Sequence, residues 1–158
     1  MDGSGSGRDE PCARRPLQDR RSDVEVRVLL DSNAYSNLKR GHSPVADLVR
    51  RSEEVLLPIV VIGELLYGFR YGSRLERNLS ELQDFMDDPL VTVAAMTLTT
   101  ADRYSRIAAA LRAKGRPLPS NDIWIAAHTQ ETGADLISYD EHFSQVDGLA
   151  WLHLSMEG

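Results

Sequence analysis

Cysteine and long apolar runs are almost absent from this 158-residue chain. The single cysteine, Cys12, excludes an internal disulfide and a cysteine-rich metal site. No apolar stretch approaches the roughly 20 residues that a membrane-spanning helix needs, and the N-terminus lacks the apolar core of a signal peptide. The sequence therefore predicts a cytoplasmic protein with no membrane partner.

Positive charge is missing from the last quarter of the chain. All 18 Lys and Arg residues lie at or before Arg116, and acids continue after it. The net charge of −6 argues only weakly against a nucleic-acid partner, because a patch of carboxylates can hold divalent cations and so reverse the field that a phosphate meets. An acidic balance therefore does not exclude an enzyme that acts on nucleic acid.

The length suits one domain with one sizeable core. Residues 1–23 are rich in Gly, Ser, Arg and Asp and have almost no apolar side chains, so we expect a disordered leader or tag there. Residues 24–158 are expected to form the folded domain.

Apolar runs and helical patterns alternate along the folded part. One strand is predicted to begin at Val26, and further strands are predicted at residues 54–58, 90–94, 136–138 and 149–154. Helices are predicted at residues 32–40, 60–71, 74–88, 99–114 and 120–132. A further short helix is predicted with Ser43 as N-cap and Pro44 at its first position. Such alternation is typical of an α/β protein with a parallel sheet and right-handed crossovers.

The first predicted strand ends in a carboxylate, Asp31. Ligands of open α/β sheets bind outside the carboxyl ends of the strands, which makes this acid a functional candidate. The alternative is an aspartate that only caps the following helix.

Glu64 lies inside the apolar run VIGELLYG. A buried and unpaired carboxylate is unfavourable, and a metal ion or a basic partner would remove that penalty. The alternative is an ordinary glutamate on a helix surface.

Two more acids, Asp122 and Asp140, occupy equivalent places in the predicted topology. Asp122 falls in the first turn of a helix, where it could simply act as a cap, and Asp140 follows a strand. In parallel α/β units the helix starts and the strand ends share one edge, so we expect Asp31, Glu64, Asp122 and Asp140 to face one crevice. No Lys or Arg follows Arg116 to neutralise the last two.

Four motifs in the chain resemble one family. They are LLDSNAYSNL, VIGELLYG, PLPSNDIWIAAH and LISYDEHFSQVDGL, which are similar in order and spacing to the PIN-domain ribonucleases, most closely the VapC-type toxins of bacterial toxin–antitoxin pairs. The resemblance covers about Val26 to Leu154. It implies a PIN domain over residues 24–158, folded as a three-layer α/β/α sandwich with a central, mostly parallel sheet of four to five strands.

The resemblance also implies roles for the four acids, which match the family's catalytic, metal-binding positions: Asp31, Glu64, Asp122 and Asp140. Clustered carboxylates without paired His or Cys suit Mg²⁺ or Mn²⁺ rather than zinc. Such ions polarise a scissile phosphate and lower the pKa of a bound water. Asn33 and Ser138 are predicted to support the acids, with Ser138 standing where the family commonly has Thr.

The function that follows is a metal-dependent endoribonuclease, acting as the toxin of a pair and inhibited by a cognate antitoxin. Two alternatives remain open: a catalytically silent PIN binding module, and a Mg²⁺-dependent receiver or phosphotransfer-like domain. Contacts to the RNA substrate are predicted from basic residues, although each could be an ordinary surface charge: Lys39, Arg40, Arg70, Arg74, Arg77, Lys114 and Arg116.

A homodimer is predicted from the amphipathic helix at 74–88. Its apolar side chains recur at helical spacing, and Phe69 and Tyr71 lie close by in the sequence. Together they offer more apolar surface than one short sheet needs.

Overall fold

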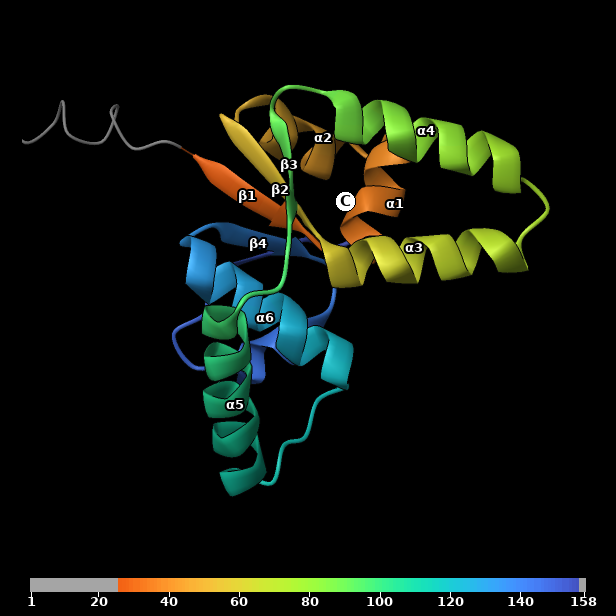
Figure 1. Ribbon diagram of the computed structural model, residues 1–158. Coiled ribbons are helices and arrows are strands. Elements are labelled where there is room, and N and C mark those ends of the chain that lie inside the picture. Colours follow the sequence, from red (N-terminus) through yellow and green to blue (C-terminus); the bar gives the residue numbers. More distant parts are fainter. Residues whose placement is uncertain (1–25, 157–158) are drawn as a thin grey trace, which may run out of the picture.

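The computed structural model describes residues 26–156, in which a five-stranded sheet forms the centre. The strands are β1 (Arg27–Leu30), β2 (Glu54–Pro58), β3 (Val91–Ala94), β4 (Asp135–Ser138) and β5 (Trp151–His153). They lie in the order β3-β2-β1-β4-β5, and every pairing is parallel (Figure 1). The predicted α/β class and strand number are confirmed. The predicted leader, residues 1–23, lies outside the described residues.

Helices cover both faces of the sheet and complete the α/β/α sandwich. They are α1 (Ser32–Lys39), α2 (Ser43–Arg50), α3 (Ile59–Tyr71), α4 (Leu75–Asp87), α5 (Leu98–Ala113) and α6 (Ser120–Thr132), and a short 3₁₀ helix, η2, spans Glu141–Gln145. Figure 1 shows α5 and α6 packed together on one side, whereas α3 and α4 run side by side away from the sheet. No helix within residues 26–156 is long and apolar enough to cross a membrane.

The core lies where the central strands meet both helical layers. Leu29 and Leu30 of β1 and Leu136 and Ile137 of β4 are fully buried. Parallel strands that are covered on both faces are apolar on both faces, which explains why these strands read as continuous apolar runs rather than alternating ones. The polar residues that follow them are therefore delivered to the carboxyl edge of the sheet.

The helix boundaries agree with the predicted ones to within one or two residues, with one correction at α2. His42 is the N-cap of this helix, so Ser43 is its first residue and not the cap. At the end of α6, Gly133 adopts φ +70, a left-handed conformation that glycine tolerates without strain. This residue turns the chain from α6 into β4.

The apolar face of α4 mostly packs inward. Leu82 is buried, and the ring of Phe85 meets the ring of Tyr35 edge-on at 5.3 Å between centroids. Exposed apolar side chains lie on and beside the edge strand β3: Ile59, Leu90, Val93, Met96 and Leu98. Tyr67 and Tyr71 of α3 are exposed as well. The apolar side chains of α4 thus serve the core more than an outer surface.

Candidate active site

A cleft of about 520 Å³ opens at the carboxyl edge of the sheet. All four candidate acids line it, although they come from four different parts of the chain: Asp31, Glu64, Asp122 and Asp140. Asn33 lines the same cleft, which we call the acid cleft. No Lys or Arg belongs to this lining among the described residues.

Asp31 follows β1 directly and is only 5% exposed. Its Oδ1 accepts a hydrogen bond from the Ala34 backbone N–H at 2.8 Å, so the carboxylate caps α1. Burial raises the pKa of Asp31 to about 6, and the charges of Asp122 and Asp140 add to the rise, against the hydrogen bonds from Ser138 and Ala34. Asp31 therefore caps α1 and also lines the cleft, so the two roles considered for this residue do not exclude each other.

Ser138, the last residue of β4, connects two of the acids. Its hydroxyl is fully buried and donates to Oδ2 of Asp31, while its Oγ accepts from the Asp140 backbone N–H at 3.0 Å. This is the supporting position that the sequence predicts for Ser138. A single hydroxyl therefore fixes the orientation of Asp31 and the turn that carries Asp140.

Glu64 reaches the cleft from α3. Its Oε1 is buried and has no hydrogen-bond partner within residues 26–156. Burial raises the pKa of Glu64, and the charges of Asp122 and Asp31 raise it further, partly offset by the Asn121 side chain. A buried carboxylate oxygen without a partner is a place where a cation would be favourable.

Asp122 lies in the first turn of α6, whose N-cap residue, Pro119, makes no side-chain capping bond. Burial is the largest cause that raises the pKa of Asp122, and the charge of Asp140 raises it further, whereas the charge of His142 lowers it. Asp140 accepts at Oδ1 from the His142 backbone N–H at 2.9 Å. One ligand atom each from Asp122, Asp140 and His142 lie within 4.8 Å of one another.

His142 is the residue that sequence reasoning missed. No prediction from the sequence pairs His142 with an acid, but η2 turns it back so that its Nδ1 lies 3.1 Å from Oδ1 of Asp140. The spacing Asp-x-His directly after a strand could have indicated this. The histidine adds a nitrogen to an otherwise oxygen-rich group of ligands.

The donor set fits a divalent cation. Several carboxylate oxygens converge, and one buried oxygen of Glu64 has no partner among the described residues. Burial, and after it the charges of neighbouring acids, raise the pKa of three of the four acids. Oxygen ligands of this kind suit hard cations such as Mg²⁺ or Mn²⁺. A cation in the cleft would relieve both the repulsion and the missing partner.

Residues 28–149 match the family model of the PIN domain. The chain belongs to the PIN domain family. Among curated relatives, the chain is 26% identical over 115 residues to Ribonuclease VapC2 of Haemophilus influenzae. The aligned region covers 72% of this chain and 86% of that protein.

Solved structures agree on the fold of this PIN domain. VapBC2 from Rickettsia felis, bound to a DNA fragment from the promoter, matches with a TM-score of 0.74 and 18% identity over 82% of this chain and 100% of that one. VapBC-5 of Mycobacterium tuberculosis, a member of the VapBC family of toxin-antitoxin systems, matches with a TM-score of 0.62 and 20% identity over 83% and 99%. At these identities the likeness establishes the fold.

A second cleft of about 520 Å³ adjoins the acids of this PIN domain. It shares Ser32, Asn33 and Glu64 with the acid cleft and lies between α1, α3 and α4. Four of the predicted RNA-binding residues line it: Lys39, Arg40, Arg74 and Arg77. We call it the basic cleft.

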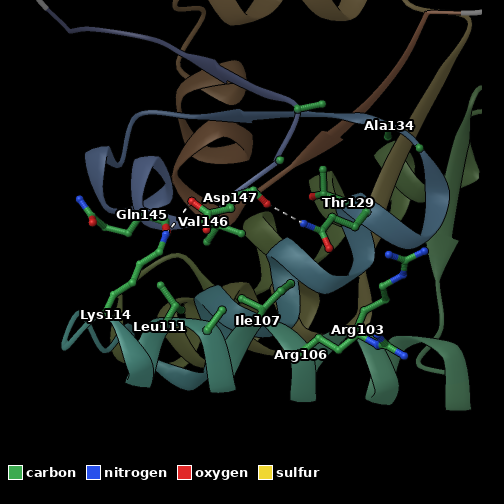
Figure 2. Close-up of a pocket in the computed structure, with 15 residues that line it drawn as sticks. Arg103, Arg106, Ile107, Leu111, Lys114, Thr129, Ala134, Gln145, Val146 and Asp147 are labelled. Atoms are coloured by element: carbon green, nitrogen blue, oxygen red, sulfur yellow. Dashed lines mark hydrogen bonds and ion pairs between the residues drawn. The ribbon is translucent and has the colours of Figure 1, made fainter.

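The remaining candidates for RNA binding lie elsewhere. Arg70 and Arg116 line neither of the two clefts. Lys114 lines a third cavity of about 540 Å³, where it donates to Asp147 at 2.6 Å and to the Gln145 carbonyl at 3.1 Å (Figure 2). We call this the amino-edge cavity, because it lies beside the starts of β4 and β5. Lys114 is therefore engaged far from the acids.

Proposed function

We propose that this PIN domain is a divalent-metal-dependent endoribonuclease that cleaves phosphodiester bonds in RNA. The observation that carries the proposal is the convergence of Asp31, Glu64, Asp122 and Asp140 on one cleft that contains no Lys or Arg among the described residues. The family membership and the ribonuclease relative support it. The ions that suit these ligands are Mg²⁺ and Mn²⁺.

In this proposal Asp31, Asp122 and Asp140 hold the cation directly, and Glu64 supplies a further oxygen. A bound divalent ion would polarise the scissile phosphate and lower the pKa of a bound water. The chain's own contribution is orientation, because the Ala34 backbone N–H and the Ser138 hydroxyl fix the two oxygens of Asp31. Glu64, with its raised pKa, is placed to take up a proton at the edge of the cleft.

RNA reaches the acids along the basic cleft. Lys39, Arg40, Arg74 and Arg77 would contact the phosphates beside the scissile bond, because the basic cleft and the acid cleft share three residues. Single strands and loops are the RNA class that enters such a groove, since their backbones and bases are both accessible. A cytoplasmic location is proposed with this substrate.

The chain acts as the toxin of a toxin–antitoxin pair in this proposal. The VapBC neighbours support an antitoxin partner, and the cleft adds a physical reason. An arginine fork satisfies two carboxylates at once and competes with a metal ion for them. The antitoxin should therefore place a basic side chain near Asp122 and Asp140, where no local Lys or Arg within residues 26–156 does so.

A homodimer is proposed through the apolar side chains around β3 rather than through α4. Leu98 is 90% exposed, Val93 is exposed on the edge strand β3, and Ile59 is exposed at the start of α3. Light scattering across micromolar concentrations tests this; Leu98→Glu should reduce the mass of a dimer by half. A monomeric wild-type protein would overturn it.

An RNA-cleavage assay distinguishes the proposed function from two alternative functions. A silent binding module would bind RNA without cutting it, and a receiver-like domain would take a phosphoryl group on an acid. The test is incubation of the purified chain with a mixed RNA pool in Mg²⁺, in Mn²⁺ and in EDTA. We expect cleavage with either metal and none in EDTA; equal cleavage in EDTA, or none at all, rejects the proposal.

A further inference from the structure

Two aromatic side chains form a stack at the start of α6. The rings of Tyr104 and Trp124 lie 4.1 Å apart between centroids, with an angle of 28° between their planes. Tyr104 comes from α5 and Trp124 from α6, two helices that contact each other on one side of the sheet (Figure 1). The pair therefore bridges two helices on one side of the sheet.

The stack is joined directly to the acid cleft. The hydroxyl of Tyr104 and Oγ of Ser120 are hydrogen-bonded at 3.0 Å, and Ser120 lines the cleft with Asn121 and Asp122. Trp124 lies four residues after Ser120, which places it on the same side of α6 one turn further along. The aromatic pair is thus linked through Ser120 to the rim of the acid cleft and belongs to α5 and α6, whereas the basic cleft is lined by α1, α3 and α4.

Packing in the core does not account for Trp124. This side chain is partly exposed and is absent from the partly buried apolar residues that pack on the core, which include Trp151 and Phe85. Trp151 also stacks on a ring, that of His153, but it packs on the core and its Nε1 is buried. Trp124 is held flat by Tyr104 while part of its surface stays accessible.

We propose that Tyr104 and Trp124 form a nucleobase-stacking subsite beside the scissile phosphate. The inference rests on the proposed ribonuclease function and specifies how it grips its substrate. A partly exposed indole, kept rigid by a second ring, offers a flat face on which an unstacked base of single-stranded RNA can lie. One neighbouring nucleotide is then held by its base on this subsite, while the nucleotides on the other side are held by their phosphates in the basic cleft.

This arrangement gives the acid cleft two different walls. The basic cleft reads the backbone and is indifferent to the base, because phosphates carry no sequence information. The aromatic wall responds to the size of the base, since a purine covers more ring surface than a pyrimidine does. The subsite therefore favours a purine at one position next to the cleavage point.

Fluorescence distinguishes this subsite, because the chain has two tryptophans, Trp124 and Trp151. Trp151→Phe leaves Trp124 as the reporter, and Trp124→Phe leaves Trp151 as the matched control. Both are titrated with single-stranded oligoadenylate and oligouridylate of about ten nucleotides, within the span that such grooves cover, in an Asp31→Asn background. We expect saturable quenching in the first variant only, and stronger quenching by oligoadenylate. Quenching in both variants or in neither overturns the proposal.

Kinetics provide the second readout. Trp124→Leu should raise KM for RNA cleavage by about 5- to 150-fold, the range for the loss of one stacked base, with little change in kcat. Trp124→Phe should restore most of the affinity, which a purely structural role would not predict if circular dichroism shows both variants folded. An unchanged KM in Trp124→Leu, alongside normal cleavage by the wild type, rejects the subsite but leaves the ribonuclease proposal intact. If the wild type neither binds nor cuts RNA, both fail.

Discussion

The two edges of the sheet carry cavities of nearly equal size and opposite electrostatics. The amino-edge cavity measures about 540 Å³ and the acid cleft about 520 Å³. In the amino-edge cavity Lys114 neutralises Asp147 at 2.6 Å (Figure 2). In the acid cleft four carboxylates share one space without a Lys or Arg among the described residues. Size alone therefore does not identify the site, but unpaired charge does.

The same contrast appears in the acidities. At the edge of the core, Arg27 donates from Nε to Glu54 at 2.7 Å and lowers the pKa of that carboxyl. In the acid cleft, burial and neighbouring carboxylates raise the pKa of Asp31, Glu64 and Asp122. Acids that have partners stabilise the fold when ionised, whereas these acids destabilise it until a cation binds.

The contrast between the two edges of the sheet can be tested by neutralising one acid at each edge. Asp122→Asn should reduce RNA cleavage by roughly 10³-fold or more, because a metal ligand contributes several kcal/mol to transition-state stabilisation. Asp147→Asn at the amino-edge cavity is the matched control and should cleave normally. Cleavage rates with a defined RNA measure both. An equal loss of cleavage activity in the two variants would mean that the acids of the acid cleft have no specific role in catalysis.

Asp31→Asn should stabilise the metal-free protein at pH 8 by up to about 3 kcal/mol, the equivalent of a pKa raised from 3.8 to about 6. Asparagine caps a helix as well as aspartate does, so the cap of α1 is preserved. Denaturant unfolding in EDTA measures the gain.

The sign of this effect depends on pH. The unfolded chain releases the Asp31 proton near pH 4, and the folded chain holds it until about pH 6. Wild-type stability therefore falls as pH rises through this window, and the advantage of Asp31→Asn should vanish near pH 4. A variant that is less stable than the wild type at pH 8 in EDTA would show that Asp31 is already neutralised within the chain.

Ser138→Ala should weaken Mn²⁺ binding by about 10- to 100-fold, the usual effect of losing a group that orients metal ligands. The change removes the donor to Asp31 and the acceptor for the Asp140 N–H. Calorimetric titration with Mn²⁺ measures the affinity, and Ser138→Thr, which keeps the hydroxyl, is the control. Unaltered affinity in Ser138→Ala would limit this serine to a packing role.

The smallest expected effect concerns the two groups of basic residues. Arg74→Gln in the basic cleft should reduce the slope of log affinity for single-stranded RNA against log salt by about 0.7, the share of one phosphate contact. Arg106→Gln, whose arginine pairs with Asp102 at 2.9 Å in the wild type, is the control beside the amino-edge cavity. If Arg106→Gln changes the slope and Arg74→Gln does not, RNA takes a different route to the acids.

Periodicity and punctuation in the sequence predicted most of the fold. Apolar runs such as RVLL and DLIS indicated buried parallel strands, and Gly133 indicated the end of α6, because these signals act within a few residues. The placement of Ser43 as a cap was wrong by one residue, since capping depends on backbone angles that neighbouring residues share. Whether the apolar face of α4 packs on the core or on a partner could be decided only from the tertiary structure, because both kinds of surface give the same helical periodicity.

For the candidate site, the sequence by itself determined which carboxylates reach the carboxyl edge of the sheet. Strand ends and helix starts must meet there in any parallel α/β unit, so the identities of Asp31, Glu64, Asp122 and Asp140 followed from topology and family motifs. Only the tertiary structure decided which basic residues adjoin them, that His142 turns back towards Asp140, and that Trp124 stacks on Tyr104 beside Ser120. Those contacts join segments distant in the chain or depend on how a turn closes, and local sequence patterns carry no information about either.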